Sequence, residues 1–265
     1  MKNIIVITLL VAACLFSGCA ETKSPQPDGA IIIRTFSENL LSVQEYSGKV
    51  TINPGNPKLS SESYSIFIRY PDNFRIEYTD SKSRHKGSVS ILNGNTLIEY
   101  DPVNNETMIL ETDPYANSCT SHDYLGLLRQ IIPENTIRYA GTDHIPGQQH
   151  YILEIIPQNG TTFNQKYSEY QFSLVRVWVS PGSWAVKKID LVDTKTNQRI
   201  VTADYKELLV NEGLRDDLFS SSQYLQYRTI VAPTHPPVVM YPGVDYPLVQ
   251  GKETEEPGNT RLGSD

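Results

Sequence analysis

The sequence predicts a mainly β (α+β) fold, an incomplete antiparallel β-barrel of about 10–11 strands with helices covering its concave face. Most of the chain alternates apolar and polar residues with a period of two, short turns separate these segments, and only two segments have helical periodicity. Short turns between consecutive strands require antiparallel neighbours, and two helices are too few for repeated crossovers. A curved sheet must hide one apolar face, and the two helices are the elements that can cover it.

The first segment, residues 1–19, is expected to be a lipoprotein signal peptide. Lys2 gives a positive start, and the apolar run at 4–16 is too short for a stop-transfer helix. Small residues precede Cys19, so cleavage there would make Cys19 the lipid-carrying mature N-terminus. An ordinary secretory signal, and a competing cleavage box that ends at Cys14, are the alternatives.

Composition limits the classes of partner. Loss of Lys2 with the signal takes the formal net charge from −7 to −8, with no basic cluster, so nucleic acid and anionic membrane surfaces are poor electrostatic partners. Cys119 is then the only thiol besides Cys19, and a single thiol cannot close an intramolecular disulfide. The chain length suits one domain with a sizeable core plus tails.

A tether and a helix follow the signal. Residues 20–29 are polar and contain two prolines, which indicates an extended tether. Asp28 is a suitable N-cap for a helix that runs to about Glu45. The apolar side of this helix is expected to comprise Ile31, Ile32, Phe36, Leu40, Leu41 and Val43.

Strands and a second helix are expected next. The alternation predicts strands at 63–70, 74–79, 87–92, 96–100 and 106–111, with an Asn93-Gly94 hairpin turn between the third and the fourth. A helix capped by Thr120 or Ser121 then ends at Pro133. Its apolar side is Leu125, Leu128, Ile131 and Ile132.

Further strands complete the sheet, at 136–139, 151–155, 171–180, 183–192 and 198–209. The half-barrel domain is therefore expected to span residues 30–220. Residues 221–265 form a Pro- and Tyr-rich tail whose C-terminal end is expected to be disordered. The sixteen tyrosines suggest many half-buried strand positions with the ring inward and the hydroxyl in water.

Motifs for catalysis or metal binding are not apparent. His122-Asp123, with Cys119 three residues earlier, has too few ligands for a zinc site, and capping of the second helix is the better explanation. Neither a nucleophile elbow nor a phosphate-binding loop is present, so we expect no enzyme, no cofactor and no metal. Two N-glycosylation triplets begin at Asn105 and Asn159, both in expected turns.

Three groups of strand-and-turn segments resemble those of a known family. They are 46–51 after the first helix; 70–78 followed by 91–102; and 177–180 with 184–189, continuing to Phe219. Together, over about Ile31 to Phe219, the chain resembles the LolA-like superfamily of outer-membrane lipoprotein-sorting proteins and lipoprotein carriers. The resemblance is nearest to lipid-anchored archaeal or Gram-positive members.

The resemblance implies an apolar half-barrel cavity that binds acyl chains or lipidated proteins. The side chains expected to line it are Ile66, Ile68, Phe74, Ile76, Leu153 and Val177, although the opposite strand faces could be the inner ones. The protein would be extracytoplasmic and anchored through Cys19 to the outer face of the cell membrane, with a protein partner for its tail. The alternative is a non-catalytic surface sensor or interaction scaffold of the same fold with a filled core.

Overall fold

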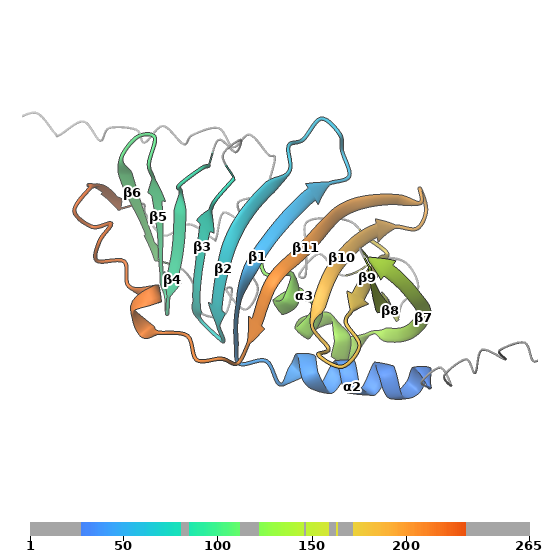
Figure 1. The fold of residues 1–265 in the computed structure, drawn as a ribbon. Helices are drawn as coiled ribbons and strands as arrows, with labels where there is room; N and C mark the ends of the chain where they lie inside the picture. The colour runs from blue at the N-terminus through green and yellow to red at the C-terminus, as the bar shows by residue number, and fades with distance from the viewer. Residues whose placement is uncertain are drawn as a thin grey trace, which may run out of the picture.

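A computed structural model of the chain shows one open, curved sheet with two α-helices packed on one side of it (Figure 1). The structure describes residues 28–80, 85–111, 122–145, 147–158, 163 and 172–231. The sheet does not close into a barrel, which confirms the predicted fold class. No helix in these described ranges is both long and apolar enough to cross a membrane.

The strands pair mostly with their neighbours in sequence. Their bounds are β1 (Glu45–Pro54), β2 (Glu62–Arg69), β3 (Asn73–Tyr78), β4 (Val89–Asn93), β5 (Thr96–Asp101), β6 (Glu106–Glu111), β7 (Thr136–Ile145), β8 (Gln148–Ile156), β9 (Leu174–Val179), β10 (Val186–Asp193), β11 (Gln198–Val210) and β12 (Arg228–Val231). The order across the sheet is β12-β6-β5-β4-β3-β2-β1-β11-β10-β9-β8-β7, so the β1–β11 pair joins the two halves.

One strand pair departs from the prediction. The sheet has 12 strands, and β12 pairs with β6 in parallel, whereas the other pairs are antiparallel. β12 comes from the expected tail, whose proline and tyrosine composition gives no alternation that would reveal a strand. Residues 232–265 lie outside the described part of the chain.

Helix α2 (Gly29–Leu41) begins where expected. Asp28 is its N-cap, and the Asp28 carboxylate accepts a hydrogen bond from the amide of Ala30 at 3.0 Å. The helix ends earlier than predicted, because the C-cap is Ser42 and Glu45 already belongs to β1.

The apolar stripe of α2 is narrower than the sequence suggested. Its buried residues are Ile32, Phe36 and Leu40, spaced by four. Ile31 and Leu41 are 50% and 43% exposed, so their assignment to the buried side was wrong. At about 100° per residue each of them lies about 140° around the helix from Phe36.

Helix α3 (Tyr124–Ile131) is capped by Asp123, and not by Thr120 or Ser121, which lie outside the described residues. The Asp123 Oδ1 atom accepts from the amide of Gly126 at 2.6 Å. A 3₁₀ turn, η1 (Ile132–Glu134), extends the helix through Pro133.

The segment at residues 214–231, which we call the strap, runs over the face of the sheet that points away from α3. Arg75 of β3 donates to the carbonyl of Leu218 and to the hydroxyl of Tyr224, both at 3.0 Å. Thr107 of β6 donates to the carbonyl of Tyr224 at 2.8 Å, and the rings of Tyr100 and Tyr227 stack with centroids 4.8 Å apart. The strap includes the 3₁₀ turn η3 (Asp216–Phe219) and leads into β12.

Candidate functional site

The face of the sheet toward α3, which we call the inner face, can be followed from strand β2. Buried residues alternate with half-buried ones along β2, and the register places Ile66 opposite Ile76 and Ile68 opposite Phe74 on β3. Tyr64 has the same parity, and its hydroxyl donates to the carbonyl of His122, next to the start of α3, at 3.1 Å. Every second residue of β2 and β3 therefore points to the face of the sheet on which α3 lies.

The six side chains predicted to line a cavity all belong to one buried cluster on this face. Their exposed fractions are 0% for Ile66, 3% for Ile68, 9% for Phe74, 2% for Ile76, 0% for Leu153 and 0% for Val177. Leu153 and Val177 pair with each other across β8 and β9. Protein side chains surround the six residues, and their contact with a ligand stays a prediction.

The other predicted sites are divided between described and undescribed parts of the chain. Cys19 and Asn159 lie outside the described residues. Asn105 lies in the exposed turn between β5 and β6, with φ of 54°, and its side chain accepts from the hydroxyl of Tyr100 at 3.2 Å. Glycosylation at either asparagine stays a prediction.

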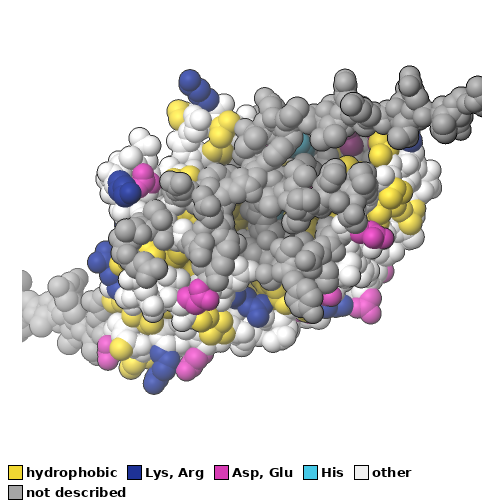
Figure 2. Space-filling model, turned by 180° about the vertical axis from the view of Figure 1, so that it is seen from behind, with side chains coloured by type: hydrophobic (Ala, Val, Ile, Leu, Met, Phe, Trp, Pro, Cys, Tyr) yellow, Lys and Arg dark blue, Asp and Glu magenta, His cyan; other side chains and the backbone are white. Residues whose placement is uncertain are grey.

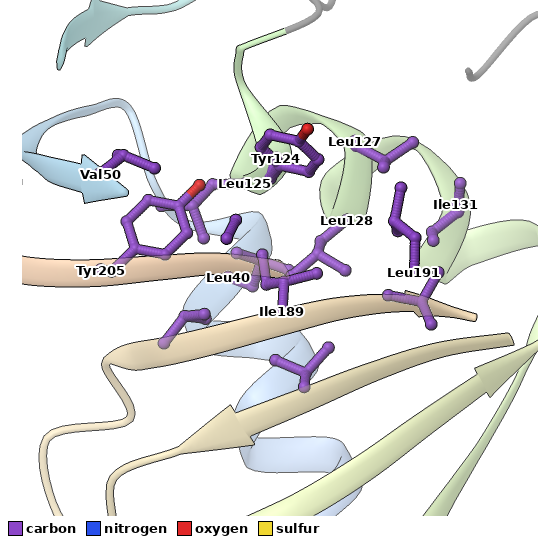
Figure 3. Close-up of a cluster of buried hydrophobic side chains, with 14 of the residues drawn as sticks. Leu40, Val50, Tyr124, Leu125, Leu127, Leu128, Ile131, Ile189, Leu191 and Tyr205 are labelled. Carbon is purple, nitrogen blue, oxygen red and sulfur yellow. The ribbon is translucent and has the colours of Figure 1, made fainter. Parts of the chain in front are cut away.

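Helix α3 fills the inner face over β1, β10 and β11. Figure 3 shows Leu125 and Leu128 of the helix directed toward Ile189 of β10 and Tyr205 of β11. Leu128 and Ile189 are completely buried. This part of the concavity is a packed core, and burial of its leucines and isoleucines is worth about 1.5–3 kcal/mol for each side chain.

The buried carboxylate of Asp123 links α3 to the sheet through hydrogen bonds. Asp123 accepts from the hydroxyl of Tyr46 on β1 at 2.6 Å and from the hydroxyl of Tyr70 at 2.9 Å, in addition to its capping bond with Gly126. The guanidinium carbon of Arg129 lies 3.9 Å from the ring centroid of Tyr70. Burial raises the pKa of Asp123, and the hydrogen bonds and the Arg129 charge offset the rise only in part.

His122, which precedes Asp123, is held in its neutral form. The Nε2 atom of His122 lies 2.8 Å from the hydroxyl oxygen of Tyr78, within hydrogen-bonding distance, and the His122 ring packs edge-on against Tyr64. Burial, with a smaller contribution from His85, lowers the pKa of His122 to about 4. The imidazole therefore carries no charge near neutral pH.

The tyrosines of this site were missed by sequence reasoning. We expected strand tyrosines to direct their hydroxyls to water, but Tyr46 and Tyr64 are buried and bond to the residues that precede α3. A signal was present, because Tyr64 and Tyr70 share the parity of Ile66 and Ile68. Their partners could not be predicted, because they depend on where α3 crosses the sheet.

Strands β3 to β6, which we call the wing, have a less completely covered inner face. The register aligns Leu97 with Leu92 on one side and with Leu110 on the other. Leu92 is buried, whereas Leu97, Met108 and Leu110 are half-buried. Figure 1 shows α2 and α3 beside β1 and β7–β11, away from the wing. The wing thus adds a partly accessible apolar surface to the buried core.

One carboxylate interrupts this apolar surface. Glu99 pairs with Ser90 and Met108, which places it on the inner face between Leu97 and Asp101. Among the residues that the structure describes, Glu99 has neither a hydrogen bond nor an ion pair. Burial raises the pKa of Glu99 from 4.5 to about 7.

The Glu99→Gln substitution should stabilise the protein at alkaline pH. The folded-state pKa lies above the unfolded value, so wild-type stability falls as pH rises between 4.5 and about 7 and then levels off. Glutamine does not ionise, and we expect a gain of about 3 kcal/mol at pH 8 with almost none at pH 4.5. Urea unfolding of both proteins across this pH range measures the difference, and an equal gain at both ends would contradict it.

Two of the described histidines each lie within hydrogen-bonding distance of a nearby group. His122 bonds to Tyr78, and the Nδ1 atom of His150 lies 2.9 Å from the carbonyl of Gln148. In the described part of the chain, no three His, Cys, Asp or Glu side chains gather as a metal site would require.

Figure 2 shows acidic and basic side chains interspersed around the described margin of the face opposite to that of Figure 1.

Comparison with known proteins gives fold neighbours but no sequence match. No known family and no curated protein matches the chain. An uncharacterized conserved protein from Thermus thermophilus is 12% identical, with a TM-score of 0.47 over 77% of this chain and 99% of that one. A putative outer membrane lipoprotein-sorting protein domain from Vibrio parahaemolyticus is 11% identical, with a TM-score of 0.39 over 74% and 97%. A LolA superfamily protein from Nitrosomonas europaea is 13% identical, with a TM-score of 0.35 over 74% and 99%.

Proposed function

We propose that this chain is a non-catalytic, membrane-anchored extracytoplasmic lipoprotein that binds acyl chains, of a lipid or of a lipidated protein, on the inner face of its sheet. The observation that carries the proposal is the half-buried apolar surface of Leu97, Met108 and Leu110 on the wing. It continues into the buried cluster through Leu92 and Phe74. A flexible hydrocarbon chain could lie along it without polar partners.

Burial of a hydrocarbon chain on this surface would supply enough free energy for binding. Removal of one methylene from water is worth about 0.8 kcal/mol, so six buried methylenes contribute about 5 kcal/mol before the cost of ordering the chain. Residues 20–27, which precede the N-cap Asp28, span at most about 30 Å when extended. A lipid at Cys19 would therefore hold the sheet close to the membrane from which acyl chains come, which suits local handover better than free shuttling.

A titration tests this proposal. A fatty acid with an environment-sensitive fluorophore, added to the purified full chain, should gain emission and saturate at about one equivalent. Unlabelled lipid should displace it. A linear, non-saturating increase that matches a control protein of similar charge would refute the proposal.

A sensor or protein-interaction scaffold of the same fold is the second candidate. The complete burial of Leu153 and Val177, and the filling of the concavity by α3, favour it for the β7–β11 half of the sheet. The tail beyond the strap would then contact the protein partner. Crosslinking of the full chain at the cell surface should recover one partner, and that partner should be lost when residues 232–265 are removed.

A further inference from the structure

A group of polar side chains, which we call the polar corner, lies on the inner face near the N-terminus of α3. It comprises Glu62, Tyr78, Glu99 and His122. Glu62 of β2 is buried, and its charge and that of Glu99 both act on the Tyr78 hydroxyl, whose pKa is raised above its ordinary value, first by burial and then by these two carboxylates. The Tyr78 hydroxyl in turn bonds to His122. Three strands and the helix N-terminus thus bring their polar groups to one place beside the apolar surface of the wing.

Glu99 is the carboxylate of this corner to which no described residue offers a positive charge. His122 is neutral, because burial lowers the pKa of its imidazole to about 4. Glu99 has no ion-pair or hydrogen-bond partner among the described residues. A half-buried carboxylate without a partner is costly, and a positively charged donor would remove that cost.

We propose that the lipid bound on the wing carries a protonated amine in its head group and that Glu99 receives this amine, with Glu62 and Tyr78 beside it. The inference rests on the proposed function, because it identifies the polar end of the same ligand. The acyl chain would lie along Leu97 and Leu110, next to Glu99 on the same face. A charge-assisted bond from an ammonium to the carboxylate would select amine lipids over those with a hydroxyl head group.

Displacement of the fluorescent fatty acid by two lysolipids tests the inference. Lysophosphatidylethanolamine and lysophosphatidylglycerol with the same acyl chain differ only in the head group. At pH 8 the wild-type full chain should bind the amine lipid at least fivefold more tightly. The preference should fall to within twofold in Glu99→Gln, and in wild type at pH 5.5, where Glu99 is protonated. Glu111→Gln, at the exposed end of β6, should keep the wild-type preference.

The outcomes separate the inference from the proposed function. Equal affinity of wild type for the two lysolipids, or an unchanged preference in Glu99→Gln, would overturn the inference and leave acyl-chain binding intact. Failure of both lysolipids to displace the probe would overturn both. Displacement by free ethanolamine at the same concentration would show that the corner takes an amine without a lipid, which contradicts the assignment of a head group.

Discussion

The Asp123→Ala substitution should lower the free energy of unfolding by about 3–5 kcal/mol. This loss should be larger than that of any other single polar substitution at this site. The substitution leaves the hydroxyls of Tyr46 and Tyr70 and the amide of Gly126 without their acceptor. Each buried unpaired group costs about 1–3 kcal/mol, and relief of the buried charge returns only part of the loss. Urea denaturation followed by circular dichroism gives the value.

Two variants control for this prediction. Asp28→Ala removes an N-cap that is exposed and has one bonded amide, so it should cost about 1 kcal/mol. Asp123→Asn keeps an oxygen acceptor and should recover more than half of the loss. A loss in Asp123→Ala as small as that in Asp28→Ala would show that the carboxylate does not fasten α3 to the sheet.

Leu110→Glu should abolish acyl-chain binding, with at least a tenfold loss of affinity in the fluorescent fatty acid titration. The new carboxylate would lie on the inner face of β6 opposite Leu97, where a hydrocarbon chain would have to cover it. Desolvation of an unpaired charge costs several kcal/mol, more than the two or three methylenes it faces can return. The fold should persist, because Leu110 is only half-buried and close to the edge of the sheet.

Two control variants separate the effect of the added charge in Leu110→Glu from the effect of its position. Leu110→Met keeps the apolar character and should bind within about twofold of wild type. Val103→Glu adds the same charge at the tip of the β5–β6 turn, where the side chain is 77% exposed, and should leave affinity unchanged. Binding by Leu110→Glu at the wild-type level would place the ligand elsewhere.

Much of the fold follows from local patterns in the sequence. The alternation of β2 and β3, the cap at Asp28 and the Asn93-Gly94 turn, where Gly94 has φ of 60°, are confirmed because each depends on a few adjacent residues. The strap and β12 were not predictable in this way. Arg75 is buried under Tyr224, and a charged residue on a strand gives no sign that a distant tail will cover it.

The sequence allowed the inward direction of the apolar side chains to be predicted, whereas their contact with a ligand stays a prediction. All six expected lining residues lie on the inner face, as the period of two requires. The polar part depends on tertiary placement: Asp123 was expected to cap a helix, and it also accepts from Tyr46, which is 77 residues earlier in the chain. Glu99 shares the parity of Leu97, so its inward direction was visible, but its unpaired state depends on the surrounding strands.

Native mass spectrometry of the full chain, purified from membranes in a mild detergent, tests acyl-chain binding most directly. We expect the native mass to exceed the denatured mass by that of one acyl lipid, while any lipid linked covalently to Cys19 remains after denaturation. The Leu110→Glu protein should lack the excess. Identical native and denatured masses for wild type, both before and after incubation with lipid, would contradict the account and leave only the anchored scaffold.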